Sequence, residues 1–201
     1  MSQLTMRQQK AQQTKKKLLE TALALFHKKG FDNVTVDEIV QACNVSKGAF
    51  YVHFNSKYDI FRERFKDIDD FYTSFMPKIP PNIRASEKII LFYEAQMRYL
   101  RDDLGKDLIR TVYTSALSLT IEQDHYLANP NRNLYKIIHS FVQEGIQNGE
   151  FKKDLSDEDI SMLITRCMRG TIYDWIIFGD QLDPVVEIRK FTSIMLDGLR
   201  A

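Results

Sequence analysis

The sequence predicts an all-α protein, in which an N-terminal three-helix helix-turn-helix domain is joined by a long fourth helix to a C-terminal helical bundle. Apolar residues recur at helical spacing almost throughout the 201 residues, and the alternation typical of strands is nearly absent. Capping sequences and glycine or proline breaks divide this pattern into short helices first and longer helices later. A chain of this length can form one small domain and one larger domain.

The first predicted helix covers residues 14–29. Its apolar positions are spaced four residues apart and form one stripe, which consists of Leu18, Ala22 and Phe26. Gly30 follows the helix and suits the left-handed position that commonly ends one. The residues before this helix, 1–13, are expected to form a flexible arm.

Two short helices joined by a tight turn are predicted next. The sequence TVDE at 35–38 fits a capping box, with Thr35 as the N-cap and Glu38 as the returning acceptor. The helix that it opens should end near Cys43. Asn44 and Val45 would then make the turn, and Ser46 would cap a third helix that continues to about residue 53.

A fourth, long helix is predicted after the break at residues 55–56. Ser56 and Asp59 can cap its start, and a cluster of prolines ends it near Met76. Further helical segments are expected near residues 85–103, 105–123, 132–148, 156–178 and 184–199. The expected division is therefore 14–60 for the helix-turn-helix domain and 61–201 for the C-terminal domain.

The third helix carries the clearest chemical signal. A helix that enters the major groove of DNA with its N-terminal end needs small residues there, so that the backbone can approach bases and phosphates. Gly48 and Ala49 meet this need, and Lys47 adds a long cation. Phe50 and Phe54, four residues apart, are expected to face inward and hold the helix on the first two.

Residues 14–61 resemble the DNA-binding domain of the TetR family of bacterial transcriptional regulators. The resemblance depends on a pattern of matches at fixed spacings: Gly30-Phe31, Thr35, Ser46-Lys47-Gly48, Phe50-Tyr51, His53-Phe54 and Lys57. It implies mainly phosphate contacts for five of these residues: Thr35, Lys47, Tyr51, His53 and Lys57. It implies positions near the bases for Ser46, Gly48, Ala49 and Val52, and flanking phosphate contacts for Lys15, Lys16 and Lys17.

The charge distribution agrees with an anionic partner for the first part of the chain. Residues 1–60 hold nine Lys and Arg against five Asp and Glu, whereas residues 61–201 hold 19 against 22. A solvated basic tail is the alternative explanation for the early cations. The partner indicated by the resemblance is double-stranded operator DNA.

The resemblance implies that the last two helices form a four-helix bundle with those of a second copy, and thus a homodimer. The expected interface residues are Gly170, Ile172, Trp175, Ile176, Phe191 and Met195. A purely intramolecular core is the alternative, because a bundle requires apolar helices in any case. A dimer also follows from function, since two recognition helices about 34 Å apart read a pseudo-palindromic site.

The resemblance further implies a small-molecule effector that binds within the C-terminal domain. Aromatic residues and one methionine on the central helices would suit an apolar or amphipathic ligand: Tyr72, Phe75, Phe92, Tyr93, Met97, Tyr113 and Phe141. Ordinary bundle packing explains each of them equally well. The expected function is that of a repressor released by its effector, and a C-terminal domain that binds a protein partner remains the alternative.

Other classes of function are disfavoured. The sequence has no glycine-rich phosphate loop, no nucleophile elbow and no His and Cys residues at metal-ligand spacing, so neither catalysis nor a metal or cofactor is expected. Cys43 and Cys167 lie in apolar helical patterns and are expected to be buried thiols. No apolar run reaches the ~18–20 residues of a membrane span, and the polar start is unlike a signal peptide, which favours a cytoplasmic protein.

Overall fold

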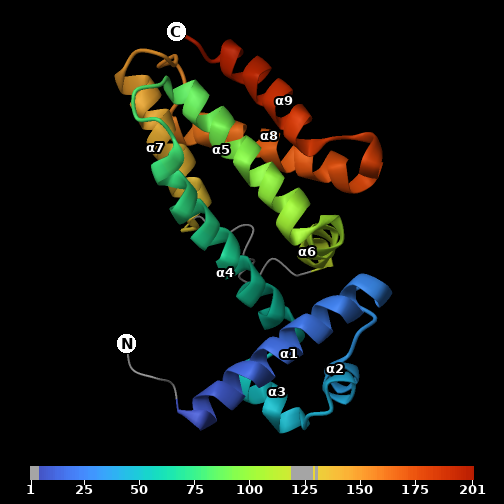
Figure 1. The fold of residues 1–201 in the computed structure, drawn as a ribbon. Helices are drawn as coiled ribbons and strands as arrows, with labels where there is room; N and C mark the ends of the chain where they lie inside the picture. The colour runs from blue at the N-terminus through green and yellow to red at the C-terminus, as the bar shows by residue number, and fades with distance from the viewer. Residues whose placement is uncertain (1–4, 119–128, 130) are drawn as a thin grey trace. The chain divides into compact units, whose positions relative to one another are not determined.

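The computed structural model describes residues 5–118, 129 and 131–201, and the all-α prediction is confirmed for them (Figure 1). The helices are α1 (Met6–Lys29), α2 (Val36–Cys43), α3 (Lys47–His53), α4 (Lys57–Phe75), α5 (Ala85–Tyr99), α6 (Lys106–Ser118), α7 (Asn133–Gln147), α8 (Asp157–Phe178) and α9 (Pro184–Gly198). Short 3-10 turns follow α4 and α8, and a π-helical turn, Leu100–Leu104, follows α5. Residues 119–123 of the predicted sixth helix lie outside the described residues. None of the described helices is long and apolar enough to cross a membrane.

The chain forms two compact units. The first unit takes residues 1–66 and 110–126, and the second takes residues 67–109 and 127–201. Both α4 and α6 therefore begin in one unit and end in the other.

The first helix begins at Met6 rather than near Thr14, so the expected flexible arm is wrong for residues 6–13. Thr5 and Gln8 form a capping box: the Thr5 hydroxyl oxygen accepts from the amide of Gln8, and the Gln8 side chain accepts from the amide of Thr5. This cap starts the helix before its apolar stripe begins. The other part of the expected arm, residues 1–4, lies outside the described residues.

The core of the first unit comes from the predicted faces of α1, α2 and α3. Its fully or almost fully buried residues include Leu18, Ala22, Phe26, Val34, Ile39, Val40, Cys43, Phe50 and Phe54. Asn44 has a φ of 53° and makes the tight turn between α2 and α3, as its place in the sequence predicts. Because the turn is short, α2 and α3 are held as a fixed pair against α1.

In the second unit α5 packs against α7 and α9, and α8 packs against the same two helices. The N-terminus of α5 is capped from a distant part of the chain, because the carboxylate of Glu150 accepts from the amides of Ala85 at 2.8 Å and Ser86 at 3.2 Å. The other cysteine, Cys167, is buried within α8, and this burial raises the pKa of its thiol. The prediction of two buried free thiols is thus confirmed.

Gly145 of α7 is required by packing in the second unit. A Cβ atom at this position would lie 2.4 Å from two ring carbons of the buried Phe151 and 3.1 Å from the Cβ of Ala85. We expect Gly145→Ala to reduce the free energy of unfolding by about 1–3 kcal/mol, because the fixed ring must move. Urea denaturation would measure this loss. Gly198→Ala is the control, since no atom lies within 4 Å of its added Cβ, and an equal loss in both variants would contradict the explanation.

Candidate nucleic-acid interface

Helix α3 is fixed in the first unit by two aromatic side chains. Phe50 and Phe54 are 0% and 2% exposed, and their ring centroids lie 5.7 Å apart. The Ser46 hydroxyl oxygen accepts from the amide of Ala49 at 3.1 Å and so caps the helix, as predicted. The inward face of this short helix is therefore occupied by packing, which leaves its other face for contact with a partner.

The outward face of α3 carries Lys47, Gly48, Tyr51 and Val52. Val52 is 78% exposed and Tyr51 is 49% exposed, although both side chains have large apolar surfaces. The ring of Tyr51 packs edge-on against Phe50, with centroids 5.4 Å apart, which orients the phenol. Ala49 and His53 are half-buried at the margins of this face. An aliphatic group and a phenol exposed on one helix fit contacts with a thymine methyl and with phosphate.

Neither packing nor backbone conformation within the protein requires a glycine at position 48. Its backbone lies in the ordinary helical region, and an added Cβ would meet only the Ser46 hydroxyl oxygen, at an unstrained 3.8 Å. Glycine nevertheless lowers helix stability relative to alanine. Close approach of another molecule to the α3 backbone would explain the glycine, and this expected role stays a prediction.

Lys47 is exposed and paired with Asp37 of α2. Its Nζ lies 2.8 Å from Oδ1 of Asp37, and this hydrogen bond raises the pKa of the lysine. This pairing could not be predicted from the sequence, because most of α2 and a turn separate Asp37 from Lys47. A phosphate would have to displace this carboxylate, so Asp37 opposes binding of Lys47 to DNA.

Thr35 and Glu38 form the predicted capping box at the start of α2. The Thr35 hydroxyl oxygen accepts from the Glu38 amide at 3.2 Å and lies 3.3 Å from the Glu38 carboxylate. Lys29, at the end of α1, bonds the same carboxylate at 2.7 Å and is the main reason for its lowered pKa. Thr35 thus has a structural role at the junction of α1 and α2, and its expected phosphate contact stays a prediction.

The role implied for Lys57 must be revised. Its ammonium group donates to the carbonyl oxygens of Phe31 at 2.7 Å and Val34 at 3.0 Å, and it lies 4.3 Å from the Phe31 ring centroid. A third carbonyl, that of Asp32, lies at 3.4 Å. These acceptors use the donors of the ammonium group, so Lys57 fixes the loop between α1 and α2 rather than presenting a free cation to phosphate.

The three expected flanking cations lie on the helical surface of α1 and differ in their environment. Lys15 is paired with Glu63 at 2.5 Å, and Lys16 lies 3.8 Å from Glu20. Lys17 is exposed, and its backbone carbonyl is 3.7 Å from the thiol of Cys43. We expect the already paired Lys15 to contribute least to any DNA contact.

The residues expected to line an effector pocket are mostly together in the core of the second unit. Phe92 is the centre of the group, with ring centroids of Tyr72, Tyr93, Phe141 and Phe75 between 5.3 and 6.5 Å away. Met97 is also fully buried, whereas Phe75 is half-buried. Tyr113 lies on the part of α6 that belongs to the first unit.

The aromatic cluster contains buried polar groups. Gln96 donates to the Tyr72 hydroxyl at 2.6 Å, while its own side-chain oxygen has no hydrogen-bond partner among the described residues. Burial raises the pKa of both Tyr72 and Tyr93. An unsatisfied amide oxygen in an apolar core is costly unless a bound molecule supplies a donor.

Three of the four interface residues expected on α8 lie on the buried face of this helix, so the expectation is wrong for those three. Ile172, Trp175 and Ile176 are only 2–7% exposed and form part of the core of the second unit. Six exposed apolar residues lie in the second half of α8 and on α9: Tyr173, Ile177, Phe178, Val186, Phe191 and Ile194. We call these six residues the α8–α9 apolar face. The sequence could not separate the two faces, because α8 is apolar around much of its circumference.

Two other expected interface residues, Gly170 of α8 and Met195 of α9, are not fully buried. A Cβ at Gly170 would lie 3.9 Å from the Phe191 ring, and Met195 is half-buried. Phe191 itself is 49% exposed and belongs to the α8–α9 apolar face. Of the six expected residues, Phe191 has the largest surface available to a partner.

Comparison with known proteins agrees with this arrangement. Residues 18–63 match the family described as bacterial regulatory proteins, tetR family, and residues 108–189 match the tetracyclin repressor-like C-terminal domain. The HTH-type transcriptional regulator AcrR of Shigella flexneri is 23% identical over 94% of this chain and 90% of its own length.

Two solved structures share the fold over nearly the whole chain. FadR from Bacillus subtilis, in complex with stearoyl-CoA, has a TM-score of 0.70 and 21% identity, and the match covers 92% of this chain and 99% of that chain. FadR from Thermus thermophilus is described as a TetR family transcriptional repressor in complex with lauroyl-CoA. It has a TM-score of 0.66 and 17% identity, and the match covers 93% of this chain and 95% of that chain.

The fold and the exposed face of α3 define a DNA-binding transcriptional regulator of the helix-turn-helix class, not an enzyme. The two family matches together span more than half of the sequence and include both its DNA-binding and its C-terminal parts. The chain belongs to the TetR family.

Proposed function

We propose that the protein is a repressor that binds a pseudo-palindromic operator as a homodimer and is released by a small amphipathic effector. The observation that carries the proposal is the outward face of α3. The fold does not require a glycine at position 48 of this face, and Val52 and Tyr51 are exposed on it. In this proposal residues 14–60 bind DNA. Residues 61–201 bind the effector and the second copy.

The homodimer is supported by the α8–α9 apolar face. Its six large apolar side chains lie on two helices that pack against each other, and each is about half or more exposed. Apolar patches of this kind mark interaction sites in soluble proteins. A two-fold axis would give the dimer two copies of α3, and two recognition helices are what a pseudo-palindromic operator requires.

The effector site is assigned to the aromatic cluster around Phe92. The apolar side chains suit a hydrocarbon part, and the unsatisfied oxygen of Gln96 suits a hydrogen-bond donor on the ligand. Both FadR neighbours hold acyl-CoA molecules, so long-chain acyl-CoA is the first class to test. Because α4 begins in one unit and ends in the other, a shift of α4 would couple the effector to α3.

The experiment that tests DNA recognition is selection of binding sites from random duplex DNA, with the Tyr51→Ala variant in parallel. We expect the wild-type protein to select a pseudo-palindrome and the variant to select none. Salt-sensitive binding without a selected sequence would contradict the proposal. The selected operator then serves as the probe in the experiments below.

Effector binding is tested by titration of acyl-CoA molecules of increasing chain length into the operator complex. A coupling free energy of ~1–3 kcal/mol would reduce operator affinity ~5–150-fold. Free CoA is the control for the head group. If no chain length changes operator affinity, acyl-CoA is excluded as the effector, and a protein partner becomes the alternative.

Gly48→Ala should separate stability from recognition. We expect a small rise in the free energy of unfolding, up to about 1 kcal/mol, because alanine is the better helix former and meets no steric obstacle here. Operator affinity should fall at least tenfold, since the methyl group blocks close approach to DNA. Thermal unfolding and fluorescence anisotropy with labelled operator measure the two effects. Unchanged affinity would mean that the α3 backbone does not approach DNA closely.

Replacement of Lys15, Lys16 and Lys17 with Gln should flatten the salt dependence of operator binding. Each lost phosphate contact lowers the slope of log binding constant against log salt concentration by ~0.9. We expect the loss of roughly one to two contacts, because Lys15 is already paired with Glu63. Binding would be measured at several salt concentrations. Lys78→Gln with Lys153→Gln is the control for charge alone. An equal change in slope in the control would show that the effect is not specific to α1.

A further inference from the structure

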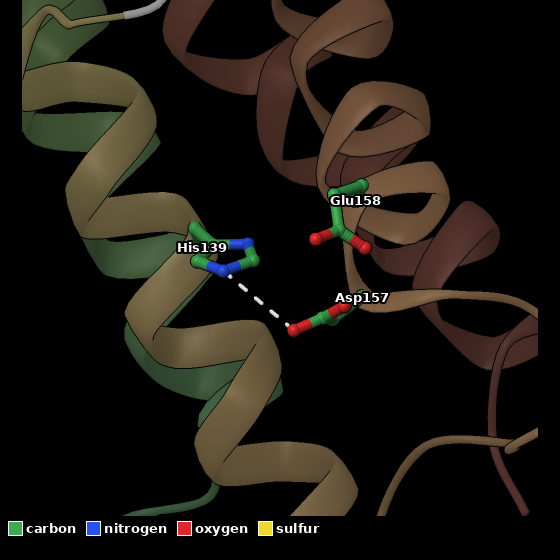
Figure 2. Close-up of side chains that lie close together, drawn as sticks. All are labelled: His139, Asp157 and Glu158. Carbon is green, nitrogen blue, oxygen red and sulfur yellow. Dashed lines mark ion pairs between the residues drawn. The ribbon is translucent and has the colours of Figure 1, made fainter.

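Three side chains with metal-binding atoms lie together outside the proposed DNA and effector sites. His139 comes from α7, and Asp157 and Glu158 come from the first turn of α8 (Figure 2). One ligand atom from each residue lies within 4.8 Å of the other two. This cluster could not be predicted from the sequence, because the rest of α7 and a loop separate His139 from the acidic pair.

The hydrogen bonds around His139 determine which ring nitrogen is available. The Ser161 hydroxyl donates to the backbone carbonyl of Asp157 at 2.6 Å, so its oxygen is left to accept from Nδ1 of His139 at 3.4 Å. The proton of a neutral imidazole then lies on Nδ1, and Nε2 carries a lone pair. Ligating histidines in proteins commonly have such a second partner, which fixes the ring and its tautomer.

The available nitrogen faces a carboxylate. Nε2 of His139 lies 3.6 Å from Oδ2 of Asp157, and Gln143 donates to that same oxygen at 3.0 Å, which fixes its position. A protonated imidazole forms an ion pair with this carboxylate, and a metal ion placed between the same two atoms would take the place of that proton. Zinc bonds of 2.0–2.2 Å place two tetrahedral ligand atoms about 3.3–3.6 Å apart, which is close to the observed separation.

The third carboxylate and a neighbouring groove complete the site. Glu158 is exposed, and Figure 2 shows its carboxylate turned toward the imidazole of His139. His139, Glu158 and Ser161 also line a groove of about 310 Å³ between α7 and α8, whose other lining residues include Tyr135, Met162 and Arg169. A metal ion held by these three residues would therefore have an accessible side.

We propose that His139, Asp157 and Glu158 bind a Zn²⁺ ion whose fourth position opens to the groove between α7 and α8. One imidazole nitrogen and two carboxylate oxygens form a ligand set that zinc accepts, whereas Mg²⁺ prefers oxygen ligands alone. The ion would link the start of α8 to the middle of α7. The proposal is independent of the repressor function, and its test uses no DNA.

The test is competition for Zn²⁺ between a chromophoric chelator and the untagged full-length protein. We expect one ion per chain, with affinity reduced at least tenfold in Glu158→Gln and in His139→Gln. Asp159→Asn is the matched control: it removes a carboxylate from the same helical turn but not from the cluster, and it should bind like the wild type.

Thermal unfolding with and without Zn²⁺ gives a second readout. The ion should raise the melting temperature of the wild type and of Asp159→Asn, and it should have little effect on the other two variants. Glu158 is exposed, so its replacement should not prevent folding even if that of His139 does. Absence of stoichiometric binding, or equal affinity in Glu158→Gln and Asp159→Asn, would overturn the proposal.

Discussion

Replacement of Ile194 with Asp is expected to produce a monomer and to weaken operator binding by roughly 100-fold or more. Ile194 is 65% exposed on α9 and is the most exposed member of the α8–α9 apolar face. A charge buried there without a partner would cost several kcal/mol at the proposed interface. A monomer has only one α3, and it therefore loses the second half-site. Analytical ultracentrifugation and operator titration measure the two effects.

Leu155→Asp provides the control for Ile194→Asp. Leu155 is also an exposed apolar residue, at 39%, but it lies in the segment before α8 rather than on the α8–α9 apolar face. We expect this variant to remain a dimer with wild-type affinity. If Ile194→Asp remains a dimer, the interface must lie on another face of the protein.

Phe50→Ala is expected to unfold the first unit selectively and to abolish operator binding. The ring is fully buried and links α3 to its neighbours, and loss of such a side chain typically costs about 3–5 kcal/mol. Trp175, the only tryptophan, lies in α8 of the second unit and is buried there. Its fluorescence should therefore report the second unit, while far-UV circular dichroism reports both.

The expected result for Phe50→Ala is an early loss of part of the helical signal, followed by an unchanged fluorescence transition. Val52→Ala, on the exposed face of the same helix, should change stability by less than about 0.5 kcal/mol. It should instead alter the preferred operator sequence, because Val52 is assigned to base contact. A parallel shift of both transitions in Phe50→Ala would show that the two units unfold together.

The sequence predicted those parts of the fold that depend on local interactions. The capping boxes and turns depend on residues within a few positions of each other, so Thr35 with Glu38, Ser46 and Asn44 could be assigned correctly. The early start of α1 was missed because its cap, formed by Thr5, precedes the apolar stripe. The inward Phe50 and Phe54 follow from their spacing alone.

Features that depend on tertiary packing could not be predicted in the same way. Positions one residue apart on a helix point about 100° apart, so Ile176 and Ile177 of α8 have opposite environments with the same side chain. Lys57 donates to carbonyl oxygens of a loop more than twenty residues earlier, and Asp37 pairs with Lys47 across a turn. The cluster of His139, Asp157 and Glu158 likewise forms only when α7 and α8 pack.

The burial of both native thiols makes the chain suited to site-directed labelling. Cys43 is fully buried and Cys167 is 5% exposed, with a thiol whose pKa is raised by burial, so neither should react with maleimide or methanethiosulfonate reagents in the folded protein. A single cysteine introduced at Val52 would then carry a spin label without prior removal of native residues. In a dimer, two such labels would give the distance between recognition helices by electron paramagnetic resonance, with and without effector.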